Sequence, residues 1–117
     1  YVQNIDESII KKMKGNCWLK FEPFIIHVCC KNIESALHFI KLAKQVGFKR
    51  GGITSIREED RVIVEVCGVD KLEVPIANEN GLLISEEYLQ FLVEESNKKM
   101  GRNNERIKRL YDLLVNE

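Results

Sequence analysis

The sequence has few of the features that mark membrane, fibrous or multidomain proteins. It contains two prolines and seven glycines in 117 residues, and no stretch rich in Pro, Gly or Ser that would act as a linker. Its longest apolar runs, such as those on either side of His27, are far shorter than the roughly 20 residues of a membrane-spanning helix. These absences predict a single domain over residues 1–117 with no membrane span.

Neither sign of charge dominates, because the sequence contains 18 basic and 18 acidic side chains. The four cysteines, at 17, 29, 30 and 67, contain no C-x-x-C, so the usual zinc and redox signatures are absent. We therefore expect reduced thiols in a cytoplasmic protein. His27 and Cys29 share one face of a strand, but two ligands at this spacing are weak grounds for a metal site, and none is assigned.

Three helices are predicted. A capping box at Asn4 and Glu7 opens a helix over about 5–14. Asn32 caps a second helix, whose predicted buried stripe comprises Ile33, Ala36, Leu37, Ile40, Ala43 and Gly47. Ser85 caps a long C-terminal helix with heptad-like apolar spacing to Leu114, which Gly101 and two asparagines would bend or divide.

The strands are predicted from β-branched and aromatic runs. Residues 17–30 form two strands joined by a kink at Pro23, and near-continuous apolarity predicts that the second is buried on both faces. Further strands cover 53–56, 61–67, 71–76 and 82–84. The tight turns at 57–60 and 68–70 predict antiparallel neighbours. The expected fold is α+β, with a largely antiparallel sheet of about five to six strands, flanking helices and a long C-terminal helix.

The first strand carries an unusual set of side chains on one face. Alternation places Trp18, Lys20 and Glu22 together. The indole can stack on a nucleobase or a cofactor adenine while the charged groups contact phosphate or ribose. The same pattern also fits an amphipathic strand with a solvated ion pair.

His27 lies in the most apolar strand of the chain. A buried imidazole with one backbone hydrogen bond is the ordinary interpretation. The alternative is a general base or an orienting group, because the unperturbed pKa of histidine lies near working pH.

Two further segments suit anions. Gly51 and Gly52 precede Thr54 and Ser55, so backbone amides and hydroxyls could meet an anion or a ligand carboxylate, although a turn and bulge is the simpler interpretation. Basic side chains gather in two stretches, which could neutralise phosphates or merely keep helical faces solvated. They are Lys41, Lys44, Lys49 and Arg50, and Lys98, Lys99 and Arg102, with three more up to Arg109.

The block WLKFEPFIIHV, from Trp18 to Val28, resembles the tRNA wybutosine-synthesizing protein 3 family, most closely its archaeal members. The likeness continues through GITSI from Gly52, LEVP from Leu72, SEEYL from Ser85 and NKKM from Asn97. It covers nearly the whole chain from Trp18 onward. The resemblance implies an enzyme that transfers a methyl group from S-adenosylmethionine to the N4 nitrogen of a tricyclic guanosine derivative beside the anticodon of tRNA-Phe.

The resemblance also implies roles for the candidates above. His27 becomes the base or orienting residue. Trp18, Lys20 and Glu22 become contacts to the cofactor or the modified base, and Thr54 with Ser55 becomes polar contacts to the methionine portion. The basic segments become contacts to the tRNA backbone.

One family motif is missing. Members carry upstream a Ser-rich motif, S-x-S-S-C-x-G-R, yet no Ser-Ser pair occurs here and the sequence starts at Tyr1. We therefore expect the C-terminal portion of a member or one half of a split enzyme, whose site an N-terminal segment or second chain completes. Two alternatives stay open: a tRNA-binding or assembly module without chemistry, and an interaction domain that associates through the C-terminal helix.

Overall fold

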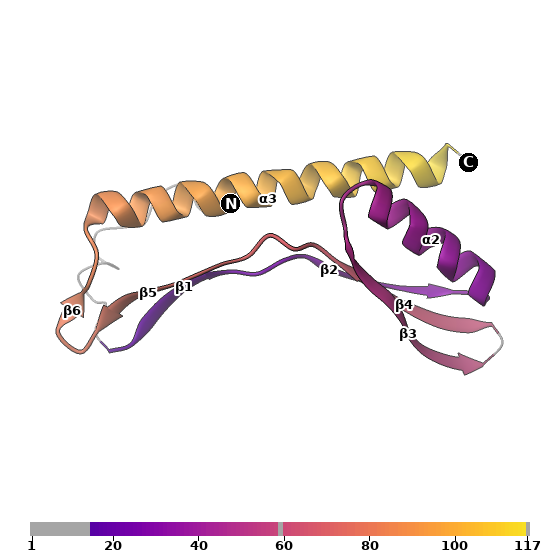
Figure 1. Ribbon diagram of the computed structural model, residues 1–117, viewed down its shortest axis with the longest axis horizontal. Coiled ribbons are helices and arrows are strands. Elements are labelled where there is room, and N and C mark those ends of the chain that lie inside the picture. Colours follow the sequence, from indigo (N-terminus) through magenta and orange to yellow (C-terminus); the bar gives the residue numbers. More distant parts are fainter. Residues whose placement is uncertain (1–14, 59, 117) are drawn as a thin grey trace. The chain divides into compact units, whose positions relative to one another are not determined.

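A computed structural model describes residues 15–58 and 60–116. Its elements run in the order β1 (Cys17–Phe21), β2 (Ile25–Cys30), α2 (Ile33–Gln45), β3 (Arg50–Glu58), β4 (Arg61–Cys67), β5 (Leu72–Asn78), β6 (Gly81–Leu82) and α3 (Glu86–Val115) (Figure 1). The chain divides into two compact units: unit 1 comprises residues 1–22 and 70–102, and unit 2 comprises residues 23–69 and 103–117. The helix predicted over 5–14 lies outside the described residues.

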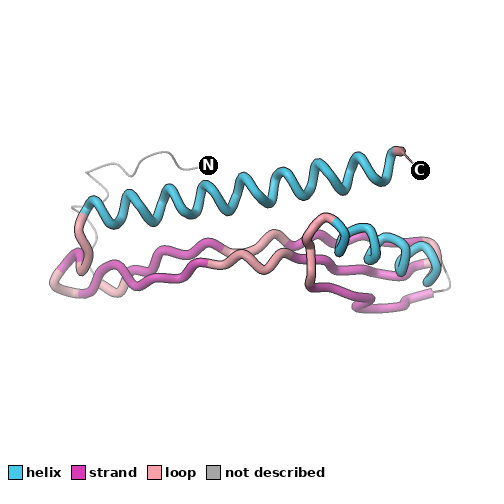
Figure 2. Tube along the Cα trace, turned by 45° about the horizontal axis from the view of Figure 1, so that its top comes forward, coloured by secondary structure: helices cyan, strands magenta, loops and turns pink. Residues whose placement is uncertain are grey.

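Unit 2 contains an antiparallel sheet of order β2-β4-β3 with α2 packed on one face (Figure 2). The central strand β4 alternates, and its valines Val62, Val64 and Val66 are almost completely buried toward the helix. Asn32 caps α2 as predicted, since its side-chain oxygen accepts a hydrogen bond from the Ser35 amide at 2.8 Å. The core also includes Phe39, Ala43, Phe48 and Leu110.

Unit 1 contains a second antiparallel sheet, of order β1-β5-β6. Its core is Ile76 of β5 with Leu89 and Leu92 of α3, and Leu19 and Val74 pack against it. Ser85 caps α3, because its hydroxyl accepts a hydrogen bond from the Tyr88 amide at 3.0 Å. The capping explains why α3 begins at Glu86.

The predicted α+β class is confirmed, and the strands separate into two sheets of three. The C-terminal helix is continuous over 30 residues. Of its heptad-like positions, Leu89, Leu92 and Leu110 are buried within the chain's own units, whereas Leu114 is exposed. None of the described helices is both long and apolar enough to cross a membrane.

Two predictions about the strands were wrong. β2 is not buried on both faces, because α2 covers one side only and Ile25, His27 and Cys29 are exposed on the other. The connection at 68–70 does not join neighbouring strands, because β4 and β5 belong to different sheets.

The predicted buried stripe of α2 was partly wrong. Ile33 and Leu37 are exposed, whereas Phe39 and Leu42 are buried instead. The buried stripe is centred on Ala36, Ile40 and Ala43, which pack against the valines of β4. Ile33 at the first turn and Leu37 beside the stripe fall outside this contact.

Candidate functional site

A hollow lies on the exposed face of the unit 2 sheet, opposite α2. Its volume is about 630 Å³, and its lining comes from all three strands. We call it the sheet hollow. It is lined by His27 and Cys29 of β2, Thr54, Ser55 and Arg57 of β3, and Arg61 and Ile63 of β4. Three residues predicted from sequence, His27, Thr54 and Ser55, therefore lie at one site.

His27 is exposed, which excludes its interpretation as a buried core histidine. Its side chain is 62% accessible, and Nε2 lies 3.0 Å from Oε2 of Glu65, the residue directly opposite it on β4. When Nε2 carries the hydrogen and donates it to this carboxylate, Nδ1 keeps a lone pair that can accept a proton. The pair thus resembles the oriented imidazoles that act as bases in enzymes.

Two adjacent glycines of β3 lie beside Glu65, and the second leaves open space there. Gly51 has φ +146°, and a Cβ placed there would overlap the Glu65 carbonyl oxygen. Gly52 pairs with Glu65, and a Cβ placed there would meet nothing within 4 Å. The register shifts just beyond, between Ile53 and Ser55, which confirms the predicted bulge. A ligand can therefore approach the backbone beside the His27–Glu65 pair.

The Thr54 hydroxyl is partly committed to the sheet. Its Oγ1 donates to the Ile63 carbonyl at 3.3 Å, so the oxygen still offers lone pairs to a ligand donor. Ser55, on the same bulge, also lines the hollow.

Trp18, Lys20 and Glu22 belong to unit 1, where Trp18 and Lys20 are exposed on β1 and Glu22 is exposed directly after it. Trp18 is 53% exposed. The ammonium group of Lys20 pairs with Glu73 across the strands at 3.5 Å, and Lys71 pairs with the same carboxylate at 3.3 Å. The hydrogen bond and charge of Lys71, followed by the charge of Lys20, lower the pKa of Glu73. Within the described residues, Lys20 is thus a cross-strand partner of Glu73.

The predicted backbone-binding cations fall on several elements. Lys41 and Lys44 are exposed on α2, and Lys49 and Arg50 are exposed at the start of β3. Lys98, Lys99 and Arg102 lie on α3 within unit 1, where Lys98 pairs with Glu95 at 3.4 Å. The two sets belong to different units.

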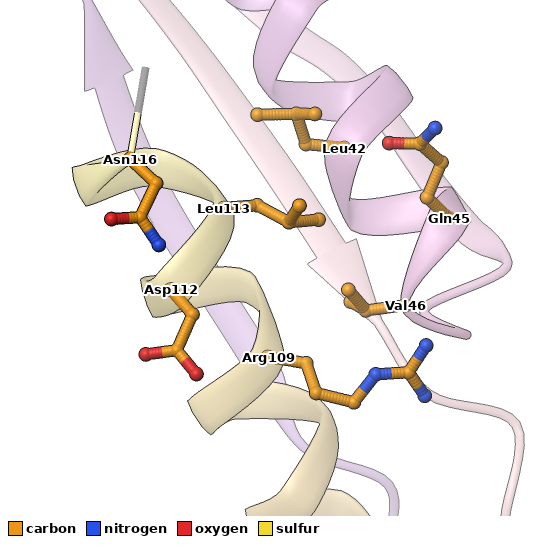
Figure 3. A pocket seen from close by; sticks show the side chains of 7 residues that line it. All are labelled: Leu42, Gln45, Val46, Arg109, Asp112, Leu113 and Asn116. Atoms are coloured by element: carbon orange, nitrogen blue, oxygen red, sulfur yellow. The ribbon is translucent and has the colours of Figure 1, made fainter.

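A second hollow of unit 2, of about 590 Å³, lies between the C-terminal turns of α2 and α3 (Figure 3). Leu113 points from α3 toward Leu42 of α2, and polar groups such as Arg109 and Asp112 border the space. Of the residues selected from the sequence, Arg109 of the second basic stretch lines it. Among the described residues, no three His, Cys, Asp or Glu side chains group as metal ligands.

Sequence reasoning missed Glu65, Arg57 and Arg61. Alternation along β4 signals that Arg61, Ile63 and Glu65 share the face opposite the valines. The partner of Glu65, however, depends on the register of β2 against β4, and these strands are separated by α2 and β3. A local pattern cannot supply that register.

An imidazole paired with a carboxylate, beside two guanidinium groups, defines a site suited to proton transfer next to an anionic substrate. Comparison with known proteins names the class. The sequence model described as "Methyltransferase TYW3" matches residues 2–116, so the chain belongs to this methyltransferase family.

Relatives and a solved structure agree with this membership. The chain is 37% identical over 105 residues to the human tRNA wybutosine-synthesizing protein 3 homolog, covering 90% of this chain and 40% of that protein. It is 31% identical over 113 residues to an Archaeoglobus fulgidus protein named tRNA(Phe) 7-((3-amino-3-carboxypropyl)-4-demethylwyosine(37)-N(4))-methyltransferase, covering 97% of this chain and 56% of that one.

The PH1069 protein of Pyrococcus horikoshii has the same fold, with a TM-score of 0.81 and 33% identity over 91% of this chain and 54% of that chain. The chain thus spans roughly half the length of the relatives it matches or less.

Proposed function

We propose that this chain acts in an S-adenosylmethionine-dependent tRNA methyltransferase of wybutosine biosynthesis, working in the cytoplasm. The substrate is the 7-(3-amino-3-carboxypropyl)-4-demethylwyosine base beside the anticodon of tRNA-Phe, and the acceptor atom is its N4 nitrogen. The observation that carries the proposal is that His27 lines the sheet hollow and is paired with Glu65, in a chain from this family.

When bound, the cofactor supplies a methyl group on a positively charged sulfur. The protein has to align donor and acceptor, and it has to accept the proton that N4 loses as the new C–N bond forms and the methyl–sulfur bond breaks, which leaves a neutral thioether. His27 accepts that proton at Nδ1, while Glu65 holds Nε2 and stabilises the imidazolium. The proton then passes to solvent, to which the side chain is open.

The described residues offer groups that fit the cofactor. In unit 1, the exposed indole of Trp18 and the exposed carboxylate of Glu22 suit a stacked base and its ribose, of the cofactor or of the RNA. Thr54 and Ser55 offer hydroxyl oxygens to the ammonium group of the methionine portion. Lys20, which pairs with Glu73, is exposed on the same strand as Trp18 and offers its ammonium group to a phosphate or ribose. An N-terminal segment or second chain completes the site.

Labelled methyl transfer tests the proposal. The substrate is tRNA-Phe that carries the demethylated precursor, with the upstream half of an archaeal relative supplied in trans. We expect transfer with both parts present. His27→Ala should lower kcat by about 10²–10⁴-fold, the usual contribution of a general base. The matched control is His38→Ala, which removes the only other histidine and should change kcat less than twofold. Full activity of His27→Ala, or no transfer by the reconstituted protein, would contradict the proposal.

Glu65→Gln separates orientation from bulk structure. It should lower kcat with little change in KM, because the amide can no longer stabilise the imidazolium. The ¹⁵N shifts of the His27 ring report its tautomer, and they should change in this variant but not in Glu34→Gln, which alters a carboxylate of α2 on the other face of the unit 2 sheet.

A tRNA-binding module without chemistry is the second candidate, favoured by the exposed cations of both units. Calorimetry discriminates between the two functions. Binding of S-adenosylmethionine favours the methyltransferase, whereas salt-dependent RNA binding without cofactor binding favours the module.

A further inference from the structure

The tip of the β3–β4 hairpin places two arginines at one end of the sheet hollow. Arg57 is the second-last residue of β3, and Arg61 is the first residue of β4. Both are exposed, and both line the same hollow as His27. Among residues 15–58 and 60–116, no carboxylate lies within ion-pair distance of either guanidinium. They therefore remain able to bind an external anion.

The sheet hollow is lined by the basic residues at the end of the β3–β4 hairpin and not by its described acidic ones. Glu58 is the register partner of Arg61, yet it lines a different hollow, together with Glu34 at the start of α2. Arg57 borders both spaces, and Asp60 is exposed in the turn. Both arginines thus line the sheet hollow, whereas Glu58 and Glu34 line only the other space.

The floor between the arginines and His27 is apolar, formed by Ile63 with Cys29. A guanidinium fork matches the oxygens of a phosphate, and an apolar floor suits a ribose or a base edge. A cofactor carboxylate would need only one guanidinium. Two arginines on adjacent strands fit a polyanion, whose charges repeat along a chain.

We propose that Arg57 and Arg61 form a phosphate-binding site for the RNA backbone, which holds the strand that enters the sheet hollow next to His27. This inference rests on the proposed function, because it takes RNA as the substrate. It assigns part of the RNA affinity to two residues outside the basic segments recognised from sequence.

The salt dependence of RNA binding tests the site. The probe is a fluorescein-labelled RNA hairpin with the anticodon-arm sequence of tRNA-Phe, titrated with the chain at 0.05–0.3 M salt. Each phosphate contact contributes about 0.7–0.9 to the slope of log K against log salt. Arg57→Gln with Arg61→Gln should therefore lower the slope by about 1.5. That corresponds to roughly thirtyfold weaker binding at 0.1 M salt, because the lines converge toward 1 M.

Two further variants control for net charge and geometry. Lys31→Gln with Lys71→Gln removes the same charge from exposed positions outside the basic segments, and its slope should fall by less than half as much. Arg57→Lys with Arg61→Lys keeps the charge and should restore most of the slope. Circular dichroism confirms folding of each variant. Equal slope losses in both neutralised pairs would overturn the proposal.

Cofactor binding distinguishes the two sources of an anion. In Arg57→Gln/Arg61→Gln, calorimetric affinity for S-adenosylmethionine should stay within twofold of the unsubstituted chain. Lost cofactor binding with an unchanged RNA slope would overturn the proposal and assign the pair to the methionine carboxylate. If the reconstituted protein transfers no methyl group while the slope still depends on the arginines, the proposed function fails and the phosphate site stands.

Discussion

The exposed faces of the two sheets carry similar side chains that are paired differently. In unit 1, two lysines share one carboxylate, since Lys20 and Lys71 both lie within 3.5 Å of Glu73. In unit 2, the carboxylate of Glu65 is paired with His27, and two arginines have no described carboxylate partner. In both sheets the sequence places basic and acidic side chains on the exposed faces of neighbouring strands. The strand register decides whether a cation is satisfied within the sheet or left for a ligand.

The largest expected effects concern whether the two units unfold as one. Phe48→Ala empties the core of unit 2 and should cost about 3–5 kcal/mol, and Leu89→Ala should cost about 2–5 kcal/mol in unit 1. Trp18 is the only tryptophan and lies in unit 1, so its fluorescence in urea reports that unit, whereas far-UV circular dichroism reports both.

We propose a single cooperative domain, so Phe48→Ala should shift both transitions equally. If the fluorescence midpoint stayed unchanged while the dichroism midpoint fell, the two units would unfold independently, and the single-domain proposal would be wrong.

The next effect concerns the backbone under the sheet hollow. Gly51→Ala should lose about 3 kcal/mol, because φ +146° disfavours alanine and the new methyl group would overlap the Glu65 carbonyl. Gly52→Ala is the matched control, with open space at its Cβ, and should change stability by no more than about 0.5 kcal/mol. Urea denaturation measures both. Equal losses would show that the neighbouring positions are not distinguished by this contact.

Alkylation of neighbouring cysteines tests which face of β2 is open. Cys29 is exposed in the sheet hollow, whereas Cys30 is buried, and burial followed by the neighbouring Cys29 raises the pKa of the Cys30 thiol. Iodoacetamide should modify Cys29 at least about tenfold faster, as mass spectrometry of peptides would show. Cys29→Ser should remove the fast phase. Faster modification of Cys30 would reverse the assigned faces.

The smallest effect is the titration of Glu73 in unit 1. Its folded pKa is lowered, so the carboxylate contributes stability above its unfolded pKa of about 4.3, and this contribution is lost as pH falls through the folded value. Lys71→Ala should raise the midpoint of the Glu73 carboxyl resonance by more than Lys20→Ala does. A Lys98→Ala variant, which affects the Glu95 pair instead, should leave it unchanged. An unmoved midpoint in Lys71→Ala would contradict the assigned cause.

Local patterns predicted the elements well, and they predicted pairing poorly. Asn32 and Ser85 mark helix starts because a cap acts within three residues. The break at Pro23 and the bulge after Gly52 are also local properties of the backbone. The sheet to which β5 belongs depends instead on pairing with β1, across the whole of β2 to β4.

The candidate site shows the same limit. His27, Thr54 and Ser55 were identified by residue type and family block, and the structure brings them together. Glu65 and the two arginines required the register of sheet β2-β4-β3, which depends on α2 packing over one face of it. The apolar residues around His27 suggested burial on both faces of β2. A run of apolar residues does not show that a helix covers only one face of the strand.

The placement of unit 2 within the chain has a consequence for the order of folding. Its segment 23–69 interrupts unit 1 between β1 and β5, and the Gly68 amide donates to the Phe24 carbonyl at 3.2 Å, so the segment returns to where it began. An inserted piece that folds early shortens the effective loop that β1 and β5 must close, which lowers its entropic cost. In refolding, Trp18 fluorescence should therefore develop after most of the far-UV dichroism, and simultaneous recovery would argue against nucleation in the insert.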